Sequence, residues 1–261
     1  IAKFRAARRV WAKLMRDTYG AKDPRSEQLR IFVFTAGSSL TAQQPLNNVV
    51  RTSIEAMAAA LGGVQTMHVC AYDEALGVPT EQAATLALRT QQIVAFETGV
   101  TTMVDPLGGS YVLEALTDDI ERQVLDEMAA IERRGGALAC IESGYFQSAL
   151  GDSAYEYAKS VDSGERAVIG VNRFTSPAAP FEVFALDPAS EAEQVANLQG
   201  IRASRDAAAV RAALADLDAA ARADENVVPA CVTAVSAYAT VGEMVDVLRA
   251  VYGRWQPTNM F

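Results

Sequence analysis

The side chains of this sequence that could do chemistry gather in two places. Asp73 and Glu74 follow a short apolar run at 64–69, and the segment 34–52 follows another. The second place is crowded with hydrogen-bonding groups: Thr35, Ser38, Ser39, Thr41, Gln43, Gln44, Asn47 and Asn48. A carboxylate can accept hydrogen bonds from both vicinal hydroxyls of a ribose, as an acidic residue does in dinucleotide sites. The pattern therefore predicts Glu74 as a ligand of hydroxyl groups, with turn or helix capping by the Asp73–Glu74 pair as the alternative.

Two more residues could contribute chemistry, each with a plainer alternative. His68 is the only histidine, and an imidazole at a strand end can shuttle protons or bind a metal, or simply be a hydrogen-bonded pocket or core residue. Arg25 precedes the first apolar run, where its guanidinium could chelate phosphate oxygens or lie solvated in a loop. With one histidine so placed, no Ser–His–Asp or Cys–His arrangement is supported.

The composition limits the classes of function. The 261 residues carry a formal charge of −9, which argues against a general affinity for nucleic acid. No apolar run reaches the roughly 18 residues of a membrane span. Cys70, Cys140 and Cys231 are far apart and odd in number, which fits a reducing compartment and neither a zinc site nor a disulfide framework. We therefore expect a cytoplasmic protein that binds neither nucleic acid nor membrane.

Alternating strands and helices should position the candidate residues. Residues 29–34 are β-branched and aromatic with little alternation, which predicts a strand buried on both faces. A helix at 45–61 follows, then a strand at 64–69 and a long helix at 80–98. This βαβα order fits a parallel barrel, in which the loops after the strands build the site.

Three of the predicted helices carry an apolar stripe, as helices packed against a core do. One of them carries Ile120, Val124, Met128 and Ile131 and ends at Gly135-Gly136. On the first helix the stripe consists of Phe4, Ala7, Trp11, Leu14 and Thr18. On the helix at 45–61 it consists of Leu46, Val50, Ile54, Met57 and Leu61. The first helix begins inside its apolar pattern, with no initiator Met and no capping residue, which predicts missing upstream chain and hence a fragment.

Beyond residue 100 the pattern becomes mainly helical. Thr117 and the acids after it are typical of a helix N-terminus. The remaining expected elements are helices at 137–144 and 151–162, a lone strand at 167–171, an extended linker at 175–188, a helical hairpin at 189–222 and a last helix at 241–252. We therefore divide the chain into residues 1–100, with the barrel units, and residues 101–261, a mainly helical extension.

A series of sequence blocks runs through nearly the whole chain, at 34–52, 66–76, 87–93, 97–100, 104–111, 164–172 and 239–244. In order and spacing these blocks resemble the large subunit of the adenosylcobalamin-dependent acyl-CoA mutases, the methylmalonyl-CoA mutase family. The resemblance implies an α/β fold, the C-terminal portion of a (β/α)8 TIM barrel followed by a mainly α-helical extension. It also implies that the N-terminal barrel half is absent from this chain.

The resemblance assigns cofactor residues. Glu74 matches the family glutamate that binds the ribose of the 5′-deoxyadenosyl group, and Ala75 and Val78 match residues that line the corrin face. The cobalt-ligating motif of the family, Asp-x-His-x-x-Gly, does not occur at 66–71, which read Thr-Met-His-Val-Cys-Ala. The corrin-binding domain is therefore expected on another polypeptide, and no metal ligand is expected in this chain.

Three further positions bear on the cofactor and the substrate. Arg25 matches a family lysine associated with the cofactor or CoA side. Phe34 and Cys70 stand where methylmalonyl-CoA mutases have a glutamine and an asparagine, so the pocket should be more apolar, unless this is ordinary variation at strand ends. The two replacements favour the two-subunit relatives that act on isobutyryl-CoA or 2-hydroxyisobutyryl-CoA.

The function implied by the resemblance is a radical 1,2-rearrangement of an acyl-CoA, in which the cofactor carries the hard chemistry. Substrate-selecting groups of the family lie mostly in the other barrel half, so no catalytic residue is assigned here. Expected partners are the acyl-CoA, the N-terminal barrel half, a small cobalamin-binding subunit and a G-protein chaperone. The alternative is a non-catalytic paralogue that assembles with a corrin subunit or a chaperone.

Overall fold

The fold was described from a computed structural model of the 261-residue chain, in which residues 1–177, 180–181 and 183–256 are described. The chain divides into two compact units, residues 1–184 and a second unit that begins at Ala185. This division differs from the expected boundary near residue 100, which stays a prediction. Among the described residues, no helix combines the length and the apolar character that crossing a membrane would take.

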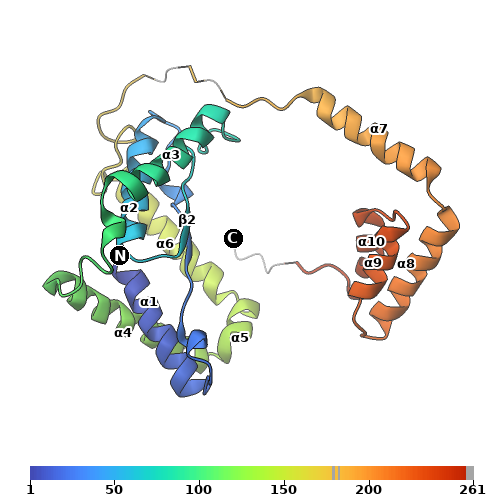
Figure 1. Ribbon diagram of the computed structural model, residues 1–261, viewed down its shortest axis with the longest axis horizontal. Helices are drawn as coiled ribbons and strands as arrows, with labels where there is room; N and C mark the ends of the chain where they lie inside the picture. The colour runs from blue at the N-terminus through green and yellow to red at the C-terminus, as the bar shows by residue number, and fades with distance from the viewer. Residues whose placement is uncertain (178–179, 182, 257–261) are drawn as a thin grey trace. The chain divides into compact units, whose positions relative to one another are not determined.

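The first unit alternates strands and helices before it becomes helical (Figure 1). Its elements are α1 (Ala2–Lys13), β1 (Phe32–Phe34), α2 (Asn47–Leu61), β2 (Thr66–His68), α3 (Glu81–Glu97), α4 (Tyr111–Arg133), α5 (Gly136–Glu142) and α6 (Tyr145–Asp162). The second unit contains α7 (Pro188–Ser204), α8 (Ala207–Arg222), α9 (Val228–Ser236) and α10 (Val241–Tyr252). The mainly helical α/β character predicted from the sequence is confirmed.

The two strands pair in parallel, with Val33 opposite Met67 and Phe34 opposite His68. The expectation of a first strand buried on both faces is wrong for this chain, because Phe32 and Phe34 are 55% and 61% exposed. The described part of the chain forms a sheet of two strands, so no further strand closes over these rings. The opposite side of the sheet is covered, since α2 and α3 pack together with residues from the end of β2 into one apolar cluster (Figure 1).

The most buried residues of α1 and α2 lie outside their predicted apolar stripes, of which Phe4, Ala7, Leu14, Met57 and Leu61 are half-buried. Helix α1 instead buries Ala2, Ala6 and Val10, and it packs against α4. Helix α2 buries Asn48, Thr52, Ala56 and Ala59 and leaves Leu46, Val50 and Ile54 exposed. The inversion on α2 is possible because its polar side chains find hydrogen-bond partners inside the protein.

Ion pairs line the joint between α1 and α4. Arg5 contacts Asp105 and Glu114, and Arg9 contacts Asp118 and Glu121. The hydrogen bond from the Gly109 amide and the pairing with Arg5 hold the pKa of Glu114 below its usual value. These pairs connect the strand-bearing part of the first unit to its helical part.

Several details of the helical region differ from the sequence-based expectations. Helix α4 begins at Tyr111, and Thr117 is buried inside it, where its hydroxyl donates to the carbonyl oxygen of Leu113. The expected lone strand is reduced to one bridge between Ile169 and Arg173. The break between α7 and α8 is confirmed, but α8 packs against α9 and α10 instead of forming a hairpin with α7. The described residues between 175 and 187 contain no helix or strand, as expected of a linker.

Candidate functional site

The ends of the two strands are joined by a threonine and a cysteine. The backbone amide of Cys70 donates to Oγ1 of Thr35 over 2.9 Å, and the Cys70 thiol donates to the carbonyl oxygen of Thr35 over 3.1 Å. Both residues are buried. Burial raises the pKa of the Cys70 thiol; its bond to Thr35 opposes this shift and the nearby charge of Glu74 adds to it. The thiol is therefore a protonated structural donor, and it points into the protein.

The loop that follows β2 carries Glu74 in a fixed place. One carboxylate oxygen of Glu74 accepts a hydrogen bond of 2.6 Å from the backbone amide of Ala71, while the other accepts none from the described residues. Asp73 is 2% exposed, and its Oδ2 accepts from both the amide and the hydroxyl of Thr80. Thr80 in turn caps α3 by accepting from the amide of Ala83. The hydrogen bonds between Asp73 and Thr80 thus tie the start of the loop to the start of α3. The second carboxylate oxygen of Glu74 accepts no hydrogen bond from the described residues.

Asn48 links the two loops that follow the strands. Its side-chain amide donates to the carbonyl oxygens of Thr41, over 2.9 Å, and Tyr72, over 2.8 Å. Its Oδ1 accepts from the Thr41 amide and from Arg51. Arg51 also donates to the Ile169 carbonyl oxygen over 2.8 Å, which brings a third segment to the same place.

The predicted cofactor residues next to Glu74 lie at the surface. Ala75 is exposed and Val78 is 59% exposed, so both present apolar surface beside the carboxylate. Phe34 lies at the end of β1, with its ring centroid 4.9 Å from that of His68. His68 is exposed and its ring lies tilted by 54° against that of Phe34, which places it at the rim of the strand ends rather than in the core.

Arg25 is not brought to this site. It lies in the turn Pro24–Glu27, in the segment that precedes β1, whereas Glu74 follows the end of β2. Its guanidinium pairs with Asp23 over 2.7 Å and is largely exposed. The assignment of Arg25 to the cofactor or CoA side stays a prediction.

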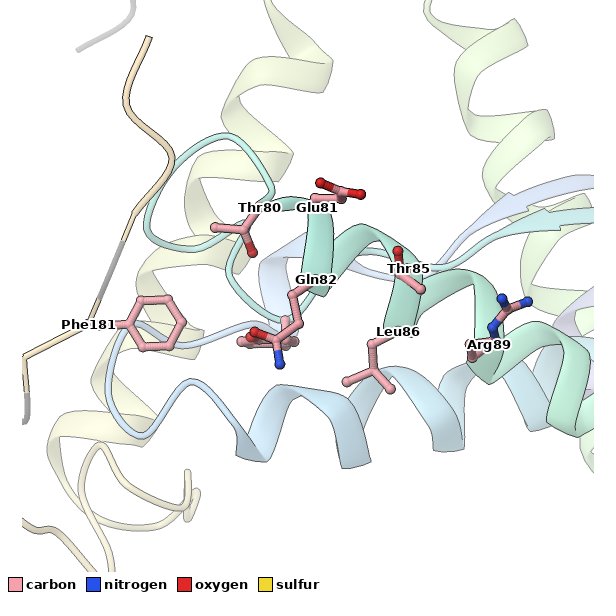
Figure 2. Close-up of a pocket in the computed structure, with 8 residues that line it drawn as sticks. Thr80, Glu81, Gln82, Thr85, Leu86, Arg89 and Phe181 are labelled. Atoms are coloured by element: carbon pink, nitrogen blue, oxygen red, sulfur yellow. The ribbon is translucent and has the colours of Figure 1, made fainter. Parts of the chain in front are cut away.

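A hollow of about 800 Å³ lies beside the β2–α3 loop (Figure 2). It is lined by Tyr72, Thr80, Glu81, Gln82, Thr85, Leu86, Arg89 and Phe181. Gln82 and Leu86 project from the same side of α3 (Figure 2). Two of its polar groups already have partners, since Arg89 donates to Gln92 and Thr80 donates to Asp73.

Comparison with known protein families shows which family this chain belongs to. The family model described as methylmalonyl-CoA mutase matches residues 1–254. The chain belongs to the methylmalonyl-CoA mutase family. The family membership predicted from the sequence blocks is therefore confirmed.

Individual members of the mutase family align with nearly all of the chain. The 2-hydroxyisobutanoyl-CoA mutase large subunit of Aquincola tertiaricarbonis is 43% identical over 264 residues, which covers 100% of this chain and 47% of that protein. The methylmalonyl-CoA mutase of Escherichia coli is 41% identical over 98% of this chain and 36% of its own length. The human mitochondrial methylmalonyl-CoA mutase is 40% identical over 97% of this chain and 34% of its own length. The chain thus spans about half or less of the length of these relatives.

Sequence reasoning missed the roles of Asn48 and Arg51. Asn48 was visible only as one of many polar residues in the segment 34–52, and nothing in the local sequence names its partner Tyr72, which lies 24 residues away. Asn48 follows the expected helix start at residue 45, where a polar residue is usually explained as a cap. The structure shows that Asn48 is buried on a face of α2 that otherwise carries small side chains. This burial is what indicates its structural role.

Proposed function

We propose that this chain is the C-terminal barrel portion and helical extension of a cobalamin-dependent acyl-CoA mutase, an isomerase that rearranges the carbon skeleton of an acyl-CoA. The observation that carries the proposal is the family match over residues 1–254. The chain spans 47% of the length of the Aquincola large subunit. We therefore propose mutase activity only for this chain assembled with the segments that its relatives have in addition.

The strand pair supports the barrel portion of this proposal. Parallel strands joined through a helix are the repeating unit of a (β/α)8 barrel, and β1–α2–β2–α3 is two such units. Phe32 and Phe34 leave apolar surface open on the side of the sheet away from α2 and α3. We assign this surface to the barrel interior, to be completed by an N-terminal half with the remaining strands.

Adenosylcobalamin fits the groups that follow β2. The free carboxylate oxygen of Glu74 is an acceptor for ribose hydroxyls, and exposed Val78 and Ala75 supply apolar contact for a corrin face. When bound, this cofactor supplies a carbon-centred radical by homolysis of its cobalt–carbon bond. In the proposal Glu74 orients the adenosyl group, Val78 and Ala75 contact the corrin, and the closed barrel excludes water from the reacting atoms.

The apolar character of the strand ends supports a branched acyl-CoA without a second carboxylate. Phe34 offers a ring where the methylmalonyl-CoA enzymes are expected to have an amide, and the Cys70 thiol is turned toward Thr35. We therefore place isobutyryl-CoA and 2-hydroxyisobutyryl-CoA ahead of methylmalonyl-CoA as substrates. One of the relatives is itself named a 2-hydroxyisobutanoyl-CoA mutase large subunit.

The partners in this proposal are an N-terminal barrel half and a small cobalamin-binding subunit. The term large subunit in the name of the Aquincola relative supports a second subunit for that protein, and we extend it to this chain. A G-protein chaperone that loads the cofactor completes the proposed set.

The test is turnover by the assembled protein. The chain is produced with its N-terminal half and a cobalamin-binding subunit, adenosylcobalamin is added, and each of the three acyl-CoA thioesters is supplied in turn. The expected result is cofactor-dependent conversion of a branched acyl-CoA to its isomer, detected by chromatography with mass spectrometry. Binding of the cobalamin subunit with no turnover on any of the thioesters would instead indicate a non-catalytic assembly module.

A further inference from the structure

The loop that holds Glu74 is attached to the rest of the first unit at regular points. Cys70 is held by Thr35, Tyr72 by Asn48 and Asp73 by Thr80. Of these three attachments, the one through Asn48 is made by a side chain from the first turn of α2, the helix that follows β1. It therefore joins two segments that the sheet itself does not join.

We propose that Asn48 is a positioning residue that fixes the β2–α3 loop, and with it Glu74, against the β1–α2 loop. The inference rests on the proposed function, because it concerns the place of the residue assigned to the adenosyl ribose. Asn48 itself makes no contact with the ligand in this scheme; it acts through the Tyr72 carbonyl, two residues before Glu74.

The hydrogen-bonding capacity of Asn48 suits this task. A primary amide has two N–H donors and one carbonyl acceptor with two lone pairs, and all four are used here. The donors reach Thr41 and Tyr72, and the acceptor takes the Thr41 amide and Arg51. The residue is 0% exposed, so water cannot replace a lost partner, and each bond is directional in a medium of low dielectric.

Arg51 extends the same network to the segment after α6. It lies one turn beyond Asn48 on α2 and donates to Asn48 Oδ1, to the Thr41 hydroxyl and to the Ile169 carbonyl oxygen. Gln44 makes a parallel connection by donating to the Phe174 carbonyl oxygen over 2.9 Å. The 169–174 turn thus braces the β1–α2 loop, and Asn48 passes that support on to the loop of Glu74.

The decisive variant is Asn48→Asp in the full assembled protein. Aspartate keeps the acceptor for Thr41 and Arg51 but places a carboxylate oxygen against the carbonyl oxygens of Thr41 and Tyr72. The matched control is Asn197→Asp, the same change at an exposed asparagine of α7. The measurements are hydrogen exchange without cofactor and the KM for adenosylcobalamin against kcat for the acyl-CoA.

The expected result for Asn48→Asp is faster amide exchange confined to residues 70–77 and a KM for adenosylcobalamin raised about tenfold, the scale of one buried hydrogen bond lost. Asn197→Asp should change neither. Faster exchange spread equally over α2 and α3, or an unchanged exchange rate at 70–77 in a folded variant, would overturn the positioning role.

A milder variant keeps the inference testable if Asn48→Asp does not fold. Asn48→Ser retains a donor and an acceptor in a smaller side chain, and it should give effects on exchange and KM between those of the native residue and aspartate. Equal behaviour of serine and asparagine in both measurements would contradict the proposal. Absence of turnover in the unmodified assembly, with local exchange changes as expected, would count against the proposed function and leave the positioning role supported.

Discussion

The strand-end loops and the three-helix cluster α8–α10 differ in the polarity of the side chains that they bury. Among the described residues of this cluster the buried side chains are all apolar: Val210, Ala213, Leu217, Ala221, Ala234 and Ala239. Around the strand ends the buried residues include Thr35, Asn48 and Asp73, and each makes hydrogen bonds to a loop. The α8–α10 cluster is therefore held by apolar packing, whereas the strand-end loops of the first unit add a polar network to the apolar cluster of α2 and α3.

The difference shows what each kind of core can do. Burial of apolar area stabilises a unit roughly in proportion to the area removed from water and is non-directional. Hydrogen bonds between buried groups fix distance and direction, and a partner left alone is costly. A group such as Glu74, which must meet a ligand in one place, is accordingly carried by the polar network.

The largest expected effect is a loss of stability in the apolar core of the α8–α10 cluster, without a change in turnover. Leu217→Ala removes a fully buried side chain from the inner face of α8, and the cavity left should lower the free energy of unfolding by about 2–5 kcal/mol. Urea unfolding followed by circular dichroism gives the change, and Leu150→Ala, at a side chain that is 72% exposed, is the control. Turnover per folded molecule should not change, and a loss of turnover would mean that the two units are coupled.

The next largest effect is a loss of turnover caused by a change at Glu74, without a change in stability. Glu74→Ala should cut turnover of the assembled mutase by about tenfold or more, because a charge-assisted hydrogen bond contributes about 1.5–3 kcal/mol. Glu97→Ala, an exposed acid at the end of α3, is the control. The midpoint of thermal unfolding should remain close to that of the native protein. Unchanged kinetics of Glu74→Ala would remove its assigned role.

Elements with local signals could be predicted from the sequence. The helix expected at 241–252 coincides with α10, because Thr240 and Glu243 form a capping box at its start and Gly253 follows its end. The helix expected at 80–98 agrees with α3 for the same reason, since Thr80 is its N-cap. The start of α4 was misplaced because Thr117 and the acids after it have the composition of a cap inside a continuing helix.

Elements that depend on distant partners could not be predicted. The buried face of α2 was inverted because the partners of Asn48 lie in two other loops, whereas the apolar Leu46, Val50 and Ile54 follow the usual pattern of a buried stripe. The place of Glu74 after the second strand could be predicted, since a strand end is a local feature. Its support by Asn48 and Arg51 could not, because it spans three segments.

A smaller effect distinguishes the two units by their response to acid. Hydrogen bonds from Arg205 and from the Thr240 amide lower the pKa of Glu243 from 4.5 to about 2 in the folded protein. Stability from this pair is therefore fully present above about pH 4.5 and is lost as the pH falls toward 2, since the unfolded state then binds the extra proton.

Hydrogen exchange of residues 205–252 as a function of pH measures this response. Glu243→Gln should remove most of the acid sensitivity in this segment, while exchange in α2 and α3 should follow the native pH dependence. The same acid sensitivity in the variant and in the native protein would show that other carboxylates, and not Glu243, control it.

The smallest effect concerns the cap of α10. The Thr240 hydroxyl accepts from the Glu243 amide over 3.3 Å and donates to its carboxylate over 2.9 Å, so Thr240→Ala should cost about 1 kcal/mol of stability. Thr233→Ala, at an exposed threonine inside α9 whose hydroxyl bonds to Pro229 of its own helix, is the matched control and should cost less. Urea unfolding measures both changes. Because an N-cap is a polar device at the edge of an apolar core, a cost for Thr240→Ala as large as that for Leu217→Ala would mean that directional bonds, and not packing, dominate this unit as well.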